Sequence, residues 1–245
     1  MPTGSHLNIA LSGDDNYAKY MAVTMQNVVQ CLPKSTTVNF LVIDAGIKPQ
    51  TIETLTDFVG SLECATLTMV NLADKYPEEL ARLAPYCHDG KENTISVGTY
   101  GLFFIAEAFP AFDKALYIDV DVIVRHDLSP AYATAIDDKY AAVVRMLTHA
   151  QLGATKSSRS GKTFAENFTD LYGKSSENYF NAGVQLLNLK KMRQEKVKDQ
   201  LVKTLTDIPL QTFATKVEYH NQDIFNAVFC DKVAFLPLRF NCQLK

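Results

Sequence analysis

The sequence predicts an α/β fold, a single domain in which a mostly parallel central sheet is flanked by helices. The chain has 245 residues, enough for one domain with a substantial core. Hydrophobic residues make up 47% of it and charged residues 21%, which are ordinary values for a globular protein. Short apolar runs alternate with segments of helical periodicity, the pattern of a parallel sheet covered by helices on both faces.

In the first half of the chain, helical segments separate three apolar runs. Each run is short and ends in polar residues, as buried strands do. Pro49 fits the first turn of a helix, where its missing N–H is not needed. We therefore expect strands at residues 7–12, 38–44 and 66–70, and helices at about 17–29 and 49–59.

The second half contains two polar stretches without clear periodicity. Residues 74–93 include two prolines and predict a loop with a short helix. Residues 151–174 are rich in Ser, Thr, Gly and Lys and predict a mobile loop over a site. The other segments are predicted as strands at 115–118, 140–144, 184–189 and 233–236 and as helices at 96–108, 190–205 and 221–229.

Composition and charge exclude several classes of protein. The formal net charge of -3 and the pI of about 6.0 do not indicate a partner nucleic acid. No apolar run is long enough to cross a membrane, and no signal peptide begins the chain. Residues 1–6 (MPTGSH) resemble the remnant of an expression tag, so we expect the folded domain to span residues 7–245.

Cysteine usage indicates a reducing compartment, which for this chain would be the cytoplasm. The five cysteines are odd in number, scattered and without a CxxC pair, so neither a zinc site nor a disulfide framework is expected. They are Cys31, Cys64, Cys87, Cys230 and Cys242.

The strongest local feature is the segment ALYIDVDVIV, residues 115–124. Asp119 and Asp121 follow a buried strand, and in an extended segment their side chains point to the same side. Two carboxylates so close repel each other, and Mg²⁺ or Mn²⁺ would relieve that repulsion while keeping positions open for substrate phosphates. The alternative is a solvated turn that contains two acids.

A second polar cluster, SGDDNY, follows the first predicted strand. Asp14, Asp15 and Asn16 lie where a strand ends and a helix begins, a place that attracts anions and polar ligands. They could bind a base or a ribose. The alternative is that they cap the helix.

Two further clusters lie in the last third of the chain. Asn181 and Gly183 stand at the start of a predicted strand, where glycine permits a ligand to approach the backbone closely, or where the chain simply turns into the strand. Asn221, Gln222 and Asp223 gather at a helix start, and capping accounts for one of the three.

In their order along the chain these segments resemble glycosyltransferase family 8, in particular the bacterial lipopolysaccharide and lipooligosaccharide galactosyl- and glucosyltransferases. The resemblance runs from about residue 7 to residue 241. One such segment is weak evidence, whereas the ordered set is specific. The segments are DDNY, LVIDAGI, ISVGTY, LYIDVDVIV, YFNAGVQLLNLKK, NQDIFN and LPLRFN.

The resemblance implies a nucleotide-sugar-binding fold of the GT-A type that uses UDP-galactose or UDP-glucose, Mn²⁺ (or Mg²⁺) and a glycan or glycolipid acceptor, with retention of anomeric configuration. It also implies lipopolysaccharide biosynthesis in a bacterium. The positions of the motifs imply four groups of site residues. Asp14, Asp15 and Asn16 would lie at the uracil and ribose, and Asp119, Val120 and Asp121 at the diphosphate, with both aspartates on the metal. Asn181, Ala182 and Gly183 would lie along the donor sugar, and Asn221, Gln222 and Asp223 at the catalytic face of that sugar.

The reaction explains why such residues would be needed. A divalent cation neutralises the charge that develops on the departing UDP. Carboxylate and amide oxygens stabilise the oxocarbenium-like sugar. Because the amide of Gln222 is a poor nucleophile, we favour attack by the acceptor on the front face over a covalent intermediate at that residue.

The sequence departs from the family pattern in three places. Leu102 stands where relatives usually carry an arginine, and Asn221 stands where they usually carry an acid. In relatives a further segment carries a metal-binding histidine and a lysine that contacts the diphosphate. The chain ends at Lys245, before this segment, so we expect the segment to be missing. Any peripheral attachment to the inner face of the membrane through it would then be missing too. His126 and His220 are the nearest substitutes for the histidine, and Lys156, Arg159 and Lys162 for the arginine, unless they are structural or surface residues.

Two alternative functions follow from these departures and from the acidic motif. The first is a UDP-sugar-binding protein with little or no catalysis, either truncated or degenerate. The second is a haloacid dehalogenase-like phosphohydrolase, in which Asp119 would be a nucleophile, although that motif normally lies near the N-terminus. A dinucleotide oxidoreductase is not expected, because no GxGxxG follows a strand.

Overall fold

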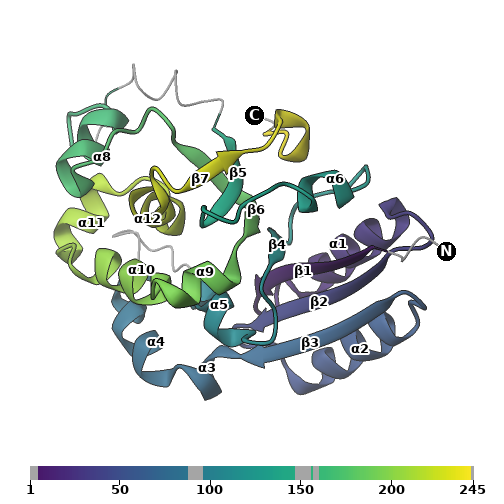
Figure 1. The fold of residues 1–245 in the computed structure, drawn as a ribbon. Helices are drawn as coiled ribbons and strands as arrows, with labels where there is room; N and C mark the ends of the chain where they lie inside the picture. Colours follow the sequence, from purple (N-terminus) through teal and green to yellow (C-terminus); the bar gives the residue numbers. More distant parts are fainter. Residues whose placement is uncertain (1–4, 88–95, 147–155, 157–159, 244–245) are drawn as a thin grey trace.

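A single seven-stranded sheet organises the chain (Figure 1). The computed structural model describes residues 5–87, 96–146, 156 and 160–243. The strand order is β3-β2-β1-β4-β6-β5-β7, and β6 runs antiparallel to both of its neighbours, whereas the other pairs are parallel. The predicted mostly parallel α/β sheet is therefore confirmed. The strands are β1 (His6–Gly13), β2 (Thr37–Asp44), β3 (Ala65–Asn71), β4 (Ala115–Ile118), β5 (Ala141–Arg145), β6 (Phe180–Leu187) and β7 (Val233–Phe235).

Helices cover both faces of the sheet, because successive strand residues point to opposite sides and both sides are apolar. In β1, for example, Ala10 packs on one face and Leu11 on the other. Leu11 shares its face with α1 (Ala18–Cys31), α2 (Pro49–Gly60) and α6 (Ser129–Tyr132). Ala10 shares its face with α3 (Leu72–Lys75), α4 (Pro77–Leu83), η1 (Ala84–Cys87), η2 (Val97–Phe104), α5 (Ile105–Ala108), α9 (Leu189–Gln194), α10 (Val197–Thr206), α11 (Leu210–Lys216) and α12 (His220–Phe229).

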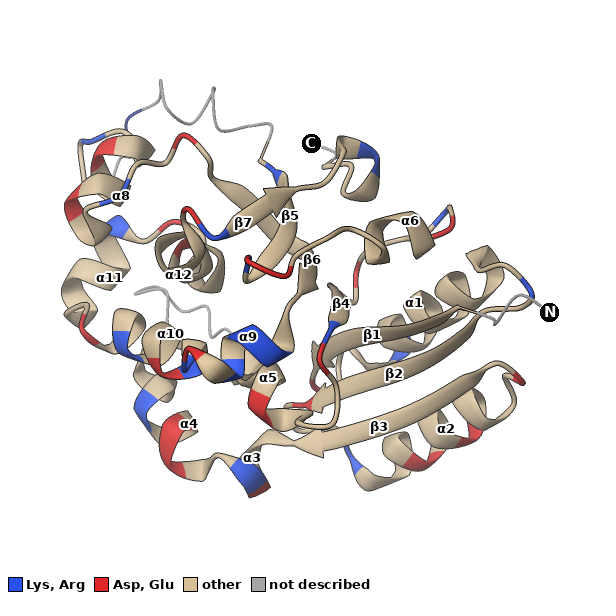
Figure 2. Ribbon diagram, viewed as in Figure 1, with Lys and Arg blue, Asp and Glu red and all other residues tan. Residues whose placement is uncertain are grey.

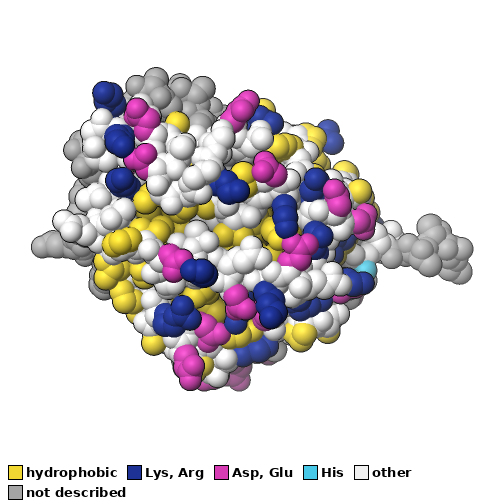
Figure 3. Space-filling view, turned by 60° about the vertical axis from the view of Figure 1, so that its left-hand side comes forward, with side chains coloured by type: hydrophobic (Ala, Val, Ile, Leu, Met, Phe, Trp, Pro, Cys, Tyr) yellow, Lys and Arg dark blue, Asp and Glu magenta, His cyan; other side chains and the backbone are white. Residues whose placement is uncertain are grey.

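Charged side chains lie mainly on the helices and loops, while β1, β2 and β3 carry few of them (Figure 2). On the face that includes α8 (Phe164–Tyr172) and α10, Lys and Arg alternate with Asp and Glu, and apolar side chains lie between them (Figure 3). Neither sign of charge dominates this face. In the part of the chain that the structure describes, no helix has the length and apolar character needed to cross a membrane.

Residues 151–174, predicted as a mobile loop, contain the helix α8, so that prediction is wrong for its second half. Thr163 and Glu166 form a reciprocal capping box at the start of α8, and Gly173 ends the helix in the left-handed conformation at φ 63°. These local signals set the bounds of a helix in a segment that is rich in polar residues. Residues 151–155 and 157–159 lie outside the described residues.

Three other element predictions need correction. The helix expected at 190–205 is two helices, since Lys196 adopts a left-handed conformation (φ 52°) between α9 and α10. The helix expected at 96–108 is mostly the 3-10 helix η2, which continues into α5. The strand expected at 184–189 starts earlier, at Phe180, because the Asn226 side chain bonds to both the N–H and the C=O of Phe180 and aligns it with Arg145 of β5. A last short 3-10 helix, η3 (Leu238–Phe240), and the helix α11 were not predicted.

Candidate active site

The acidic motif forms a turn immediately after β4. The N–H of Val122 donates to the carbonyl of Asp119 at 3.1 Å, so residues 119–122 turn and are not extended as the sequence predicted. The buried hydroxyl of Thr24 on α1 holds this turn by hydrogen bonds to the carbonyls of Val120 (3.0 Å) and Val122 (3.3 Å). The side chain of Val120 lies in the core, so only its backbone is available to a ligand.

Asp119 lies at the inner end of this turn. Its N–H donates to the carbonyl of Gly183 at 2.8 Å, and the hydroxyl of Tyr117 donates to its carboxylate at 2.7 Å. The pKa of Asp119 is raised to about 6, mainly because the carboxylate is buried; the Tyr117 hydrogen bond lowers this pKa, and the negative charge of Asp121 raises it. Metal binding requires the ionised carboxylate, so a cation bound here would displace the proton of Asp119.

Gly183 allows β6 to pass close to Asp119. A Cβ at position 183 would lie 2.9 Å from a carboxylate oxygen of Asp119 and 3.0 Å from the amide oxygen of Asn181. That amide oxygen accepts the N–H of Gly183 (2.9 Å) and the side-chain N–H of Asn241 (2.7 Å). Asn181, Ala182 and Gly183 therefore lie inside β6 and not at a strand-entry turn, which corrects that alternative.

Asp121 faces the solvent and lines an open pocket of about 570 Å³ together with the start of α1. Tyr17 and Tyr20 are 46% and 48% exposed there, and Lys19 lies 4.9 Å above the Tyr20 ring. Asn16 also lines this pocket. The structure thus brings the DDNY and DVD segments together, with an acid, an amide and two aromatic rings around one space.

The other two residues of the DDNY segment are occupied within the protein. Asp14 accepts the N–H of Asn16 at 3.0 Å. Asp15 pairs with the side chain of Lys48 (2.8 Å) and accepts its N–H (3.1 Å), and these contacts lower the pKa of Asp15 to about 2. The alternative that these residues cap α1 is wrong, because the residue preceding α1 is Tyr17 and no side chain caps the helix.

At the start of α12, Gln222 joins the helix to β6. Its amide oxygen accepts the N–H of Ala182 at 2.9 Å. Its amide nitrogen lies 3.3 Å from the hydroxyl of Tyr179 and 3.6 Å from the sulfur of Met146. Gln222 is buried and contacts the same strand that passes Asp119, so the DVD, FNAG and NQD segments form one continuous site.

The neighbours of Gln222 make their hydrogen bonds with other residues. Asn221 donates to the carbonyl of Thr99 in η2 at 2.9 Å. Asp223 is buried and accepts the hydroxyl of Tyr179 on one oxygen and the N–H of Glu218 on the other. Burial raises the pKa of Asp223 to about 6, although these hydrogen bonds act in the opposite direction.

Several residues that shape the site were missed by the sequence analysis. Tyr117 could have been found from alternation, because residues 117 and 119 share one side of a strand end. The others are polar residues within apolar segments, whose partners are distant in sequence and have no local signal. They are Thr24, Tyr179, Asn226 and Asn241.

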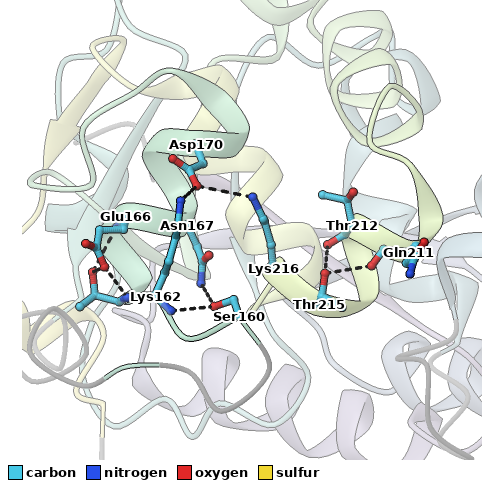
Figure 4. A network of polar contacts seen from close by, with 10 residues as sticks. Ser160, Lys162, Glu166, Asn167, Asp170, Gln211, Thr212, Thr215 and Lys216 are labelled. Carbon is cyan, nitrogen blue, oxygen red and sulfur yellow. Dashed lines mark hydrogen bonds and ion pairs between the residues drawn. The ribbon is translucent and has the colours of Figure 1, made fainter.

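The departures from the family pattern have clear structural positions. Leu102 is fully buried in the core, and His126 is exposed in the loop after the acidic turn. The ring of His220 packs against Phe213 at 5.7 Å. Lys162 pairs with Asp170 of α8 at 2.6 Å, and Lys216 of α11 approaches the same carboxylate (Figure 4).

Of the two other substitute cations, Arg159 lies outside the described residues and Lys156 is exposed. Among the described residues no group of three or more His, Cys, Asp or Glu side chains is arranged to hold a metal ion. The described side chains therefore supply at most a pair of carboxylate ligands, Asp119 and Asp121.

Solved structures of glycosyltransferases share this architecture. A galactosyltransferase, LgtC, solved in complex with donor and acceptor sugar analogs, is 28% identical with a TM-score of 0.72, covering 95% of this chain and 74% of LgtC. The bifunctional glycosyltransferase WbbM has a TM-score of 0.75 at 22% identity, covering 96% of this chain and 39% of WbbM, and shows the fold alone. The fold is that of the GT-A glycosyltransferases.

The sequence comparisons identify the family. Residues 8–245 match glycosyl transferase family 8, and the chain belongs to this family. A putative glycosyltransferase of Haemophilus influenzae is 24% identical, covering 96% of this chain and 63% of the relative. A lipopolysaccharide 1,2-glucosyltransferase of Escherichia coli is 24% identical, covering 96% of this chain and 62% of the relative. The chain therefore spans somewhat less than two thirds of the length of these two relatives. The family decides against the phosphohydrolase alternative.

Proposed function

We propose that the protein transfers galactose or glucose from a UDP-sugar to a glycan or glycolipid acceptor, with retention of configuration and with Mn²⁺ or Mg²⁺ held by Asp119 and Asp121. The observation that carries this proposal is the acidic turn, in which Asp119 has a pKa of about 6 and lies against the backbone of Gly183. The resemblance to bacterial lipopolysaccharide glycosyltransferases suggests the acceptor class.

The donor groups fit a hard divalent cation. Two carboxylates from one turn supply oxygen ligands, which Mg²⁺ and Mn²⁺ prefer, and such sites leave positions for substrate phosphates. The charge of Asp121 raises the pKa of Asp119, so the two carboxylates are close enough to repel and a cation would relieve that repulsion. When bound, the cation would neutralise charge on the departing UDP.

The chain's own residues would bind and orient the donor. Asn16 and the exposed ring of Tyr17 lie beside Asp121, where a planar base could stack and accept hydrogen bonds. The segment from Asn181 to Gly183 passes Asp119 on the other side and would line the sugar. In this arrangement the diphosphate would bridge the two halves of the site.

Gln222 supports retention by attack on the front face. Its amide oxygen already accepts the Ala182 N–H, so it is oriented as a fixed dipole at the donor strand and is not free to act as a nucleophile. Fixed dipoles aimed at a developing charge stabilise it without reorganisation. Asp223, with both oxygens occupied by hydrogen-bond donors, would act by supporting this residue and not by direct contact with the sugar.

A UDP-sugar-binding protein with little catalysis is the second candidate. It is favoured by the absence of a third acidic or histidine ligand among the described residues and by Leu102, which puts an apolar side chain in the core where relatives usually carry an arginine. Both candidates share the donor site, and they differ in turnover. We place the protein in the cytoplasm, and the five free cysteines agree with a reducing compartment.

Turnover separates the candidates. The measurement is release of UDP from UDP-galactose and UDP-glucose by the whole protein, with and without Mn²⁺ and an acceptor glycan. We expect metal-dependent release that Asp119→Asn reduces at least about 100-fold. The control is Asp138→Asn, because Asp138 is exposed and its carboxylate pairs with the adjacent Lys139. Metal-dependent UDP binding without release would support the second candidate, and neither binding nor release would contradict both.

A further inference from the structure

We propose that Tyr179 is a positioning residue that sets the orientation of the Gln222 amide toward the donor sugar. This proposal rests on the function proposed above and adds a residue to it. Tyr179 immediately precedes β6 and is 2% exposed, so it cannot touch a bound donor directly from the surface. Its hydroxyl nevertheless lies within hydrogen-bond distance of Gln222.

The hydrogen bonds of Tyr179 run in one direction. Its hydroxyl donates its single proton to a carboxylate oxygen of Asp223. The same hydroxyl oxygen then accepts the side-chain N–H of Gln222 at 3.3 Å. A tyrosine hydroxyl has one donor and can accept as well, so both contacts are satisfied together.

This direction decides which end of the Gln222 amide faces which partner. With the Tyr179 proton committed to Asp223, only the NH₂ end of Gln222 can face Tyr179. The oxygen end then faces the N–H of Ala182, where it accepts at 2.9 Å. In the flipped amide, an NH₂ group would meet the Ala182 N–H and an oxygen would meet the lone pairs of Tyr179, which loses both hydrogen bonds.

Both Asp223 and Tyr179 are held by further contacts, so the orientation of the Gln222 amide is set before a ligand binds. Asp223 is held by the backbone N–H groups of Glu218 (2.9 Å) and Tyr219 (3.3 Å). The ring of Tyr179 packs at right angles against Phe164 (5.0 Å) and Phe168 (5.6 Å) of α8. The helix α8, which lies within the segment predicted as a loop, thereby holds the Tyr179 ring in place.

Tyr172 provides a matched control within the same cluster. It is partly buried, and its ring centroid lies 4.8 Å from that of Phe168 in a tilted arrangement. Burial and the negative charge of Asp223 raise the pKa of Tyr172, as they raise that of Tyr179. Its hydroxyl, however, has no hydrogen-bond partner among the described residues. Tyr172→Phe and Tyr179→Phe therefore remove the same atom from the same cluster, and only the second breaks the path to Gln222.

The experiment measures kcat and donor KM for UDP release by wild type, Tyr179→Phe, Tyr172→Phe, Gln222→Ala and the double variant Tyr179→Phe/Gln222→Ala. We expect Tyr179→Phe to lower kcat by about 10- to 100-fold with donor KM nearly unchanged, because a misplacement of about 1 Å can cost about 100-fold in rate. Tyr172→Phe should change kcat by less than about two-fold. In the Gln222→Ala background, Tyr179→Phe should have almost no further effect.

Additive effects of Tyr179→Phe and Gln222→Ala would overturn the proposal, as would equal losses in the Tyr179→Phe and Tyr172→Phe variants. If the wild type shows no turnover, the proposed function fails on its own, and the same cycle is then measured on the urea midpoint of unfolding. The positioning contact predicts that Tyr179→Phe lowers this midpoint less in the Gln222→Ala background than in wild type. Equal lowering in both backgrounds would contradict it.

Discussion

The two halves of the candidate site differ in how far their side chains are engaged within the protein. The acidic half comprises residues 14–17 and 119–121, and the amide half comprises residues 181–183 and 221–223. In the acidic half, Asn16, Tyr17 and Asp121 are exposed around an open pocket. In the amide half, Gln222 and Asp223 are buried and their side-chain polar groups are hydrogen-bonded.

This difference indicates a division of roles. Exposed groups with spare hydrogen-bonding capacity can bind a ligand at little internal cost, as a nucleotide and a cation require. Buried groups with satisfied partners hold fixed dipoles, which are useful where charge develops during a reaction. The junction of the two halves is the contact between Asp119 and Gly183, where the acidic turn meets β6.

The largest effect should come from breaking that junction. Gly183→Ala would place a methyl group 2.9 Å from the Asp119 carboxylate and 3.0 Å from the Asn181 amide oxygen, so both must move. We predict a loss of UDP release of about 100-fold or more, since both halves would be misplaced. Gly60→Ala, at an open position of α2 with nothing within 4 Å, should behave as wild type, and equal activity of Gly183→Ala would show that the junction is not required.

The next effect concerns the proton on Asp119. Tyr117→Phe removes the hydrogen bond that lowers the pKa of Asp119, so this pKa should rise above its value of about 6. Metal binding requires the carboxylate, so in wild type the affinity for Mn²⁺ should rise with pH up to about 6 and then level. In the variant we predict levelling at a higher pH, with binding about ten-fold weaker near pH 6 and little changed above pH 8.

Tyr86→Phe is the control for this pH profile, because the Tyr86 hydroxyl donates to the backbone carbonyl of Ile208 and not to the acidic turn. Its profile should match wild type. A Tyr117→Phe profile that does not move, or moves to lower pH, would contradict the role of Tyr117. Without metal, Asp119 has a higher pKa folded than unfolded, so its contribution to stability falls as pH rises from about 4 to about 6.

A smaller effect is expected from removing the Thr24 hydroxyl, which supports the acidic turn. Thr24→Val keeps the shape of the side chain but removes the hydroxyl that bonds to the carbonyls of Val120 and Val122. We predict a loss of about 1–2 kcal/mol in the free energy of unfolding and a several-fold loss of Mn²⁺ affinity. Thr24→Ser retains the hydroxyl and should restore affinity. Weak Mn²⁺ binding by both variants would show that the packing of the Thr24 side chain, and not its hydrogen bonds, supports the turn.

The smallest effect should come from Asp15, although the family motif places it at the nucleotide. Its carboxylate is committed to Lys48, and Asp15→Asn keeps an acceptor for the Lys48 N–H. We predict a change in UDP affinity of less than about two-fold, measured by calorimetry, against a clearly larger loss for Asn16→Ala. A large loss for Asp15→Asn would mean that this carboxylate leaves Lys48 to contact the donor.

The sequence predicted the sheet well because buried parallel strands are short apolar runs, and such runs are visible locally. It failed where polar residues continue a strand, as Asn181 does in β6, and where one residue breaks a helix, as Lys196 does between α9 and α10. At Asn181 the strand is stabilised by hydrogen bonds to residues distant in sequence. At Lys196 a left-handed conformation separates two helices that the periodicity joined.

The site was predicted as a set of segments but not as a set of contacts. Motif order pointed to Asp119, Gly183 and Gln222, and in the structure Asp119 and Gln222 both bond to the backbone of β6, at Gly183 and at Ala182. The extended geometry assumed for the acidic pair was wrong because residues 119–122 turn. Tyr179 was missed, since a tyrosine before an apolar strand gives no sign that a glutamine over 40 residues later will bond to it.

The most direct test of the acidic turn as a metal–diphosphate site is calorimetry of UDP binding with and without Mn²⁺, on wild type and Asp119→Asn at neutral pH. We predict UDP binding that requires Mn²⁺, that releases protons at lower pH as the Asp119 carboxyl ionises, and that Asp119→Asn abolishes. UDP affinity that is equal with and without Mn²⁺, or unchanged in Asp119→Asn, would contradict the assignment of Asp119 and Asp121 to the metal.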